Sequence, residues 1–211
     1  MERRIAAILA SRPLKEITRE DLVPSAVLVL LLERDGEDYI LFTKRSDKVD
    51  CHKGEVSFPG GRLDPSDSNL LEAALREGAE EIGLAPHDVT ILGRLDDTQT
   101  VTTGFVVTPY VGRIPYPYSF RINQEEIDEL IFVPVQALAA DSATNAPGVD
   151  GEEKGQGSPR FQYRDHIIWG ATARILRQFL DITSPTRDGG HGGATPDAKG
   201  SASSRGRDGK A

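Results

Sequence analysis

Several kinds of residue are scarce in this chain of 211 residues, and each shortage argues against a class of protein. The single cysteine, Cys51, cannot form a disulfide within the chain, which is typical of proteins from a reducing compartment. No apolar run approaches the roughly 18 residues that a membrane-spanning helix requires. Basic residues are also outnumbered, 25 against 33 acidic ones, and the net charge of −8 argues against a nucleic-acid coat or a polybasic membrane-binding surface. We therefore expect a cytoplasmic protein that binds neither nucleic acid nor membrane.

The two ends of the chain differ from its middle. The N-terminal MERRIAAILASRPLKE starts like a signal peptide, but its apolar run is too short, and Ile5, Ile8 and Leu9 fall on one side of a short helix. From about residue 184 apolar residues almost vanish, so that segment cannot offset the entropy cost of ordering. We expect an N-terminal helical extension that could support a homodimer, one domain and a disordered tail, at 1–24, 25–182 and 183–211.

The middle of the chain alternates between strand-like and helix-like stretches. SAVLVLLL at 25–32 is typical of a strand buried on both faces, and YILFT at 39–43 follows it like the second strand of a hairpin. A helix is expected to begin at a cap, Asp67 or Ser68, and to end at Gly83. Further strands are expected at 55–58, 89–94, 105–111, 132–135, 161–163 and 166–169, a short helix or turn at 125–131, and a last helix at 172–180. This mixture predicts an α/β (α+β) domain.

The central helix contains three closely spaced carboxylates. LREGAEEIGL places Glu77, Glu80 and Glu81 within about a third of the helix circumference, beside an apolar stripe that should pack on a sheet. Carboxylate oxygens are the ligands that Mg²⁺ prefers, and like charges this close repel one another unless a cation compensates. A solvated acidic face is the common alternative. However, FPGGR lies just upstream, where Gly60 and Gly61 let the backbone approach a ligand closely.

Together these features resemble the signature of the Nudix hydrolases. That signature runs glycine, five residues, glutamate, seven residues, and then Arg-Glu-aliphatic-x-Glu-Glu-x-Gly-aliphatic. REGAEEIGL, which starts at Arg76, fits the second half, except that Gly78 replaces the aliphatic residue. Gly61 fits the opening glycine with one extra residue of spacing, and Asp67 stands at the first acidic position.

The longer spacing and an upstream motif resemble one subgroup, the coenzyme A pyrophosphatases. Their motif is approximately Leu-Leu-Thr-x-Arg-Ser, a spacer, glycine, three residues and Phe-Pro-Gly-Gly. This chain has LFTKRSDKVDCHKGEVSFPGG at 41–61, with Asp50 where many members have a basic residue. TGFVVTPYVGRI, NQEEIDELIFVPV and IIWGATARIL are also similar, so the resemblance covers about residues 25–180. It implies the Nudix fold, a mixed β-sheet sandwiched between α-helices.

The resemblance also implies an activity, a hydrolase dependent on Mg²⁺ or Mn²⁺ that cleaves coenzyme A to 3′,5′-ADP and 4′-phosphopantetheine. Such cations neutralise charge on phosphate oxygens and lower the pKa of bound water, while a carboxylate takes the proton. Glu77 and Glu81 are the expected metal ligands, and Glu80 is a further ligand or a catalytic, water-orienting group. Glu126 is the candidate for a further metal ligand or the base from outside the helix, with an ordinary surface glutamate as an equal alternative.

Residues upstream of the central helix are candidates for substrate binding. Arg45, Lys53 and Arg62 could contact the pyrophosphate or the 3′-phosphate, since charge-assisted hydrogen bonds to phosphate favour such residues; surface charge is the alternative for each. Gly60 and Gly61 could contact the substrate through their backbone.

Two more residues are expected to have structural roles, and two other functions stay open. Arg76 is expected to pair with Glu72 or Asp67. Trp169 is expected to lie in the core at the start of the last helix, with stacking on the substrate as the alternative. The alternative functions are a Nudix hydrolase of another substrate, such as ADP-ribose or a dinucleotide, and a non-catalytic Nudix-fold binding module. The presence of all three helix glutamates argues against the second alternative.

Overall fold

The computed structural model describes residues 2–48, 53–140 and 159–183. Predictions for Asp50, Cys51 and most of the C-terminal tail therefore lie outside the described residues. The helices are α1 (Glu2–Ser11), α2 (Leu70–Ile82), the single turn η1 (Pro86–Asp88), α3 (Val135–Ala140) and α4 (Gly170–Thr183). The strands are β1 (Val23–Arg34), β2 (Glu37–Arg45), β3 (Val56–Ser57), β4 (Gly60–Arg62), β5 (Thr90–Arg94), β6 (Thr98–Gln99), β7 (Phe105–Arg113), β8 (Ile127–Pro134), β9 (Phe161–Tyr163) and β10 (His166–Ile168).

Eight strands of the described chain form one mixed sheet around β1. β1 pairs antiparallel with β2, with Leu30 opposite Leu41, and parallel with β7, with Val27 opposite Pro109. β4 pairs with the first part of β1, β8 pairs with β2, and β6 pairs with β7. The continuous apolar run predicted for β1 is explained by burial on both faces, because neighbouring side chains of a strand point to opposite sides.

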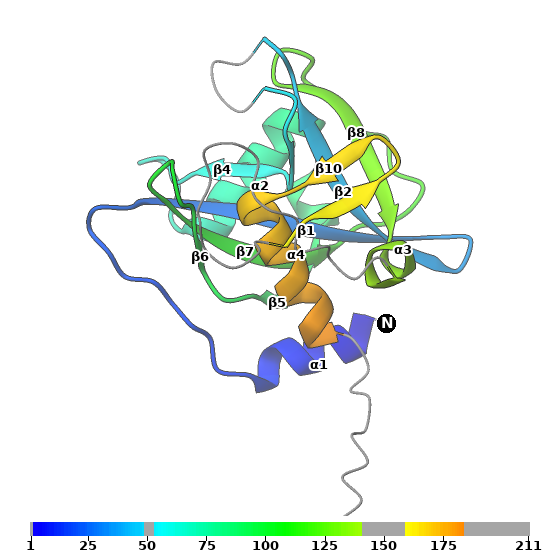
Figure 1. The fold of residues 1–211 in the computed structure, drawn as a ribbon, viewed down its shortest axis with the longest axis horizontal. Coiled ribbons are helices and arrows are strands. Elements are labelled where there is room, and N and C mark those ends of the chain that lie inside the picture. Colours follow the sequence, from blue (N-terminus) through cyan, green and yellow to red (C-terminus); the bar gives the residue numbers. More distant parts are fainter. Residues whose placement is uncertain (1, 49–52, 141–158, 184–211) are drawn as a thin grey trace, which may run out of the picture.

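Helices cover both faces of this sheet, which confirms the expected sandwich. On one face α2 contributes Ala74 and Ile82 to a cluster with Leu28 of β1. On the other face α1 and α4 pack against Val29 and its neighbours. In Figure 1 α4 lies in front of the sheet and α2 behind it.

Gly78 explains how α2 comes so close to β1. A Cβ atom at this position would lie 3.2 Å from Cδ1 of Leu28 and 3.2 Å from Cδ2 of Leu84, tighter than ordinary contact. The glycine that departs from the aliphatic position of the Nudix signature therefore brings the helix, and the carboxylates on it, closer to the sheet.

The N-terminal segment belongs to the same core. Ile5 and Leu9 of α1 are buried, and Leu9 covers Gly93 so closely that a Cβ there would lie 2.6 Å from the leucine Cβ. Further along, Arg12 pairs with Asp96, whose Oδ1 also accepts a hydrogen bond from the Lys15 amide at 3.0 Å. The apolar face of the N-terminal helix is thus buried within the chain, and the homodimer stays a prediction. No described helix is long and apolar enough to span a bilayer.

Two local predictions are wrong. The helix cap is Asn69, whose Oδ1 accepts a hydrogen bond from the Glu72 amide at 3.0 Å, because the chain remains irregular through Asp67 and Ser68. The short helix or turn predicted at 125–131 is mostly strand β8, since long-range pairing with β2 outweighs local helix preference.

Candidate active site

Glu81 is the buried carboxylate at the centre of the site. It lies in the last turn of α2, its side chain is 3% exposed, and its Oε2 accepts a hydrogen bond from the Gly60 amide at 3.1 Å. Burial raises the pKa of Glu81 to about 8, and the negative charges of Glu77 and Glu126 add to that rise. The Gly60 hydrogen bond and the Arg45 charge act in the opposite direction but do not cancel it.

Glu77 lies one turn earlier on α2, directly against β4. A Cβ at Gly61 would lie 2.4 Å from the Glu77 carboxyl carbon, so only glycine leaves room for that carboxylate. Burial raises the pKa of Glu77, the charges of Glu80 and Glu126 raise it further, and a hydrogen bond from Arg76 at 2.9 Å opposes this. The two glycines of FPGGR thus form the surface against which both helix carboxylates pack.

Glu126 approaches these two carboxylates from a distant part of the sequence. It lies in the turn before β8, where its amide bonds to the Asn123 carbonyl and its Oε1 accepts a hydrogen bond from Asn123 Nδ2 at 3.1 Å. The Asn123 amide in turn bonds to the Glu81 carbonyl at 2.9 Å, which ties this turn to the end of α2. The negative charge of Glu126 raises the pKa of both Glu77 and Glu81, so the three groups share one electrostatic environment.

Glu80 is more exposed to solvent than the nearby Glu77 and Glu81. Its side chain is 55% exposed, and its Oε2 lies 3.2 Å from Nη1 of Arg76. The Arg76 guanidinium also bonds through Nε and Nη2 to Asp67, both at 3.0 Å, and these bonds hold the pKa of Asp67 below its usual range. Arg76 therefore has the structural pairing expected with Asp67, whereas Glu72 accepts a hydrogen bond from the Ser68 amide instead.

The donor set fits a hard divalent cation. Within the described ranges, no three acidic, histidine or cysteine side chains already form a metal-ligand group, and Arg76 holds the Glu77 and Glu80 carboxylates. Nevertheless, Glu77, Glu81 and Glu126 supply carboxylate oxygens. Burial and mutual repulsion raise the pKa of Glu77 and the pKa of Glu81. A cation bound to oxygen ligands would relieve both costs.

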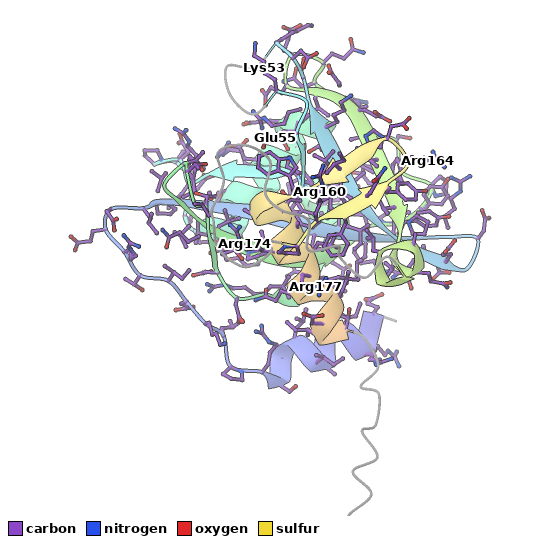
Figure 2. All side chains as sticks on the ribbon, viewed as in Figure 1. Lys53, Glu55, Arg160, Arg164, Arg174 and Arg177 are labelled. Atoms are coloured by element: carbon purple, nitrogen blue, oxygen red, sulfur yellow. The ribbon has the colours of Figure 1, made fainter. Side chains whose placement is uncertain are left out.

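A cavity of about 580 Å³ lies beside β4. Its lining includes four of the five residues predicted to bind substrate, namely Arg45, Gly60, Gly61 and Arg62. The fifth, Lys53, is exposed and is not among the lining residues; Figure 2 shows it at the outer edge of the molecule, beyond Glu55.

Arg45 joins this pocket to the carboxylates. Its Nη1 lies 3.9 Å from Glu81 Oε1, and its buried Nε has no hydrogen-bond partner within the described chain. Arg62 has a different setting, because its guanidinium lies 4.8 Å above the Phe105 ring centroid at the pocket wall. Arg45 is therefore the basic residue placed between the pocket and the acidic group.

Other pocket residues were missed or misjudged from the sequence. Trp169, expected in the core, is only half-buried and lines the pocket, because it directly precedes α4, whose first residues line the same pocket. Arg174 of α4 and the segment 100–103 also line it. The only available signal for Arg174 was its place on the polar side of an amphipathic helix, which does not distinguish a pocket from bulk solvent.

Comparisons with known proteins agree on the family. Residues 22–151 match the model of the NUDIX domain. The chain is 38% identical over 157 residues to a protein of Yersinia enterocolitica named "Uncharacterized Nudix hydrolase NudL", covering 73% of this chain and 78% of that one. A Yersinia pestis protein of the same name is 35% identical over 160 residues, covering 76% and 79%.

A solved structure supports the fold. The MutT/nudix family protein from Enterococcus faecalis aligns with a TM-score of 0.51 at 13% identity, covering 82% of this chain and 65% of that one. At this identity the similarity concerns the fold alone. The domain match and the Yersinia relatives show that this chain belongs to the Nudix hydrolase family.

Proposed function

We propose that this Nudix hydrolase cleaves the pyrophosphate of coenzyme A, giving 3′,5′-ADP and 4′-phosphopantetheine. The observation that carries the proposal is that residues of two separate sequence motifs contact the same carboxylate, that of Glu81. Arg45 and Gly60, both from the segment that resembles coenzyme A pyrophosphatases, lie against Glu81 of the Nudix helix. The upstream segment is thus part of the same site as the carboxylates.

The charge of the pocket supports a strongly anionic substrate. Its described lining contains three arginines, Arg45, Arg62 and Arg174, but one carboxylate, Glu55. The whole chain carries a net charge of −8, whereas basic side chains outnumber acidic ones in the described pocket lining. Such local reversal favours a ligand with several phosphate charges.

Burial, charge and hydrogen bonding of the carboxylates support the following roles. Glu77 and Glu81 would hold Mg²⁺ or Mn²⁺, which when bound supplies charge neutralisation at the phosphate oxygens and a more acidic water. Glu126 would accept the proton of the attacking water; its Oε1 is fixed by Asn123, which orients the carboxylate. Arg45 would offset charge on the pyrophosphate from the pocket side. Glu80 would influence the metal site indirectly, since it is bonded to Arg76, which also bonds to Glu77, and would not itself contact the metal.

Product analysis tests the substrate assignment. Purified protein is incubated with Mg²⁺ or Mn²⁺ and either coenzyme A or ADP-ribose, and the products are separated by chromatography. We expect 3′,5′-ADP and 4′-phosphopantetheine, with coenzyme A cleaved the faster of the two. Equal or faster cleavage of ADP-ribose would refute the coenzyme A assignment while leaving the Nudix family membership intact.

A further inference from the structure

Arg174 occupies a part of the pocket that the catalytic carboxylates do not explain. It lies in the second turn of α4 and lines the cavity together with Trp169. One hydrogen bond, from Nη2 to the Gln99 carbonyl at 2.9 Å, fixes the guanidinium to strand β6. Arginine has five N–H donors; among the described residues this contact uses one of them and orients the group, and four stay available to another partner.

The strand order shows that Arg174 is remote from the carboxylates. In this part of the sheet the strand order is β4, β1, β7 and β6. β4 and β7 flank residues 25–27 of β1, and β6 pairs with β7. Neighbouring strands are about 4.8 Å apart, so β6 lies roughly 14 Å from β4 across the sheet. A single pyrophosphate held at Gly60 and Glu81 is too short to reach a guanidinium attached to β6.

The surroundings of Arg174 favour an anion rather than a neutral group. Arg177 lies one turn further along α4, and in the view of Figure 2 Arg160, just before β9, appears beside this helix, although neither arginine lines the pocket. Arg177 covers the Phe161 ring at 5.7 Å, and neither arginine pairs with a carboxylate in the part of the chain that the structure describes. The half-buried Trp169 adds a flat aromatic wall to the same region, which suits a nucleobase.

We propose that Arg174 binds a second phosphate group of the substrate, a monoester remote from the scissile pyrophosphate. The inference rests on the proposed function, under which this group is the 3′-phosphate of coenzyme A. Arg174 would then be a specificity-determining residue that distinguishes 3′-phosphorylated nucleotides from those without that group. A phosphate accepts two parallel hydrogen bonds from a guanidinium, which makes the recognition geometric as well as electrostatic.

Calorimetric binding of two nucleotides that contain no pyrophosphate to cleave tests this role. The wild-type protein should bind adenosine 3′,5′-bisphosphate about tenfold or more tightly than AMP, the contribution of a charge-assisted contact. Arg174→Gln should abolish that difference and leave AMP binding unchanged. The matched control is Arg164→Gln, because Arg164 is exposed in the β9–β10 turn and does not line the pocket; it should change neither affinity.

Other results would overturn the assignment. An equal loss of AMP and bisphosphate binding in Arg174→Gln would mean a general packing role, and no loss would exclude the contact. If Arg174→Gln does not fold, as judged by thermal unfolding, Arg174→Lys is used; it keeps a donor for Gln99 and a charge, and it should lose part of the tenfold preference. Unchanged preference in that variant would also refute the role. Because no turnover is needed, a protein that fails to cleave coenzyme A would refute the proposed function separately.

Discussion

Glu81 is the residue whose position is hardest to explain by stability alone. Its carboxylate is almost fully buried, yet among the described residues its polar contacts are one backbone amide and an arginine nitrogen at 3.9 Å. Burying a charge with so few partners opposes folding. Burial also raises the pKa of Glu81 to about 8. Such a combination is frequent at functional sites, where the carboxylate is kept for a ligand rather than for the fold.

Replacement of two neighbouring glutamates should separate their roles. We expect Glu81→Gln to lower metal-dependent kcat/KM by about 1,000-fold or more, because loss of metal ligation removes several kcal/mol of transition-state stabilisation. Glu80→Gln, at a half-exposed side chain bonded to Arg76, should cause a loss at least tenfold smaller. Steady-state kinetics on both variants checks this, and equal losses would place Glu80 among the primary ligands.

The buried Glu81 also predicts a pH dependence of stability in the metal-free protein. Its pKa of about 8 in the folded state exceeds the ordinary value of 4.5, so between these limits the folded state holds a proton that the unfolded chain has released. The free energy of unfolding should therefore fall as the pH rises through this interval. Thermal unfolding in EDTA from pH 5 to about 8.5 measures it. Glu81→Gln should show a flatter profile, and an identical profile would contradict the assignment.

At the scale of elements, the site is a contact between strand β4 and helix α2. The two consecutive glycines of β4 have different neighbours. Gly60 has a positive φ of 143°, and a Cβ there would lie 2.3 Å from the Ala26 carbonyl oxygen. A Cβ at Gly61 would instead meet the flexible end of the Glu77 side chain. The first glycine is thus required by the backbone and the second by the carboxylate.

This difference predicts opposite outcomes for two alanine substitutions. Gly60→Ala should destabilise the protein by about 3 kcal/mol or more, because the backbone conformation and the neighbouring strand both oppose a side chain. Gly61→Ala should change stability by less than about 1 kcal/mol, since Glu77 can rotate away, but it should lower activity about tenfold or more. Denaturant unfolding and kinetics on the pair measure both effects. A folded, fully active Gly61→Ala variant would contradict the packing argument.

For the whole molecule, the N-terminal segment completes the core on the face opposite α2. α1 packs against β5 and α4, and the chain that follows it is attached to residues 96–97 by the Arg12 pair and by the Lys15 and Ile17 amides. Residues 98–103 continue from there into β6 and the pocket wall. The N-terminal segment therefore supports the fold close to the substrate pocket while contributing no carboxylate to the site.

Removal of the α1 contact should lower global stability. Leu9→Ala deletes a buried side chain that covers Gly93, and large-to-small changes of this kind cost about 2–5 kcal/mol. Ala7→Gly, at an exposed position of the same helix, is the matched control and should cost about 1 kcal/mol. Equal small effects in urea unfolding would show that α1 does not belong to the cooperative core.

Much of the fold and part of the site were predictable from local pattern. The apolar run of β1, the amphipathic stripe of α2 and the phase of Glu77 and Glu81 are properties of short segments, because strand and helix repeats determine which side chains share a face. The glycine pair before α2 was also visible. These features predicted an α/β domain with carboxylates along the edge of one helix, whereas the mixed sheet between helices and the metal site were implied by the resemblance to the Nudix hydrolases.

What only the tertiary structure decided is which distant residues join that site. Pairing with β2 makes 127–134 a strand and brings Glu126 to the α2 carboxylates, whereas the local pattern suggested a helix or turn at 125–131. Packing of α4 on the sheet likewise turns Trp169 and Arg174 toward a pocket. The physical reason is that periodicity records the local backbone, while burial and pocket lining depend on contacts between segments far apart in the chain. The acidic helix was therefore evident in the sequence, but its partners were determined by the fold.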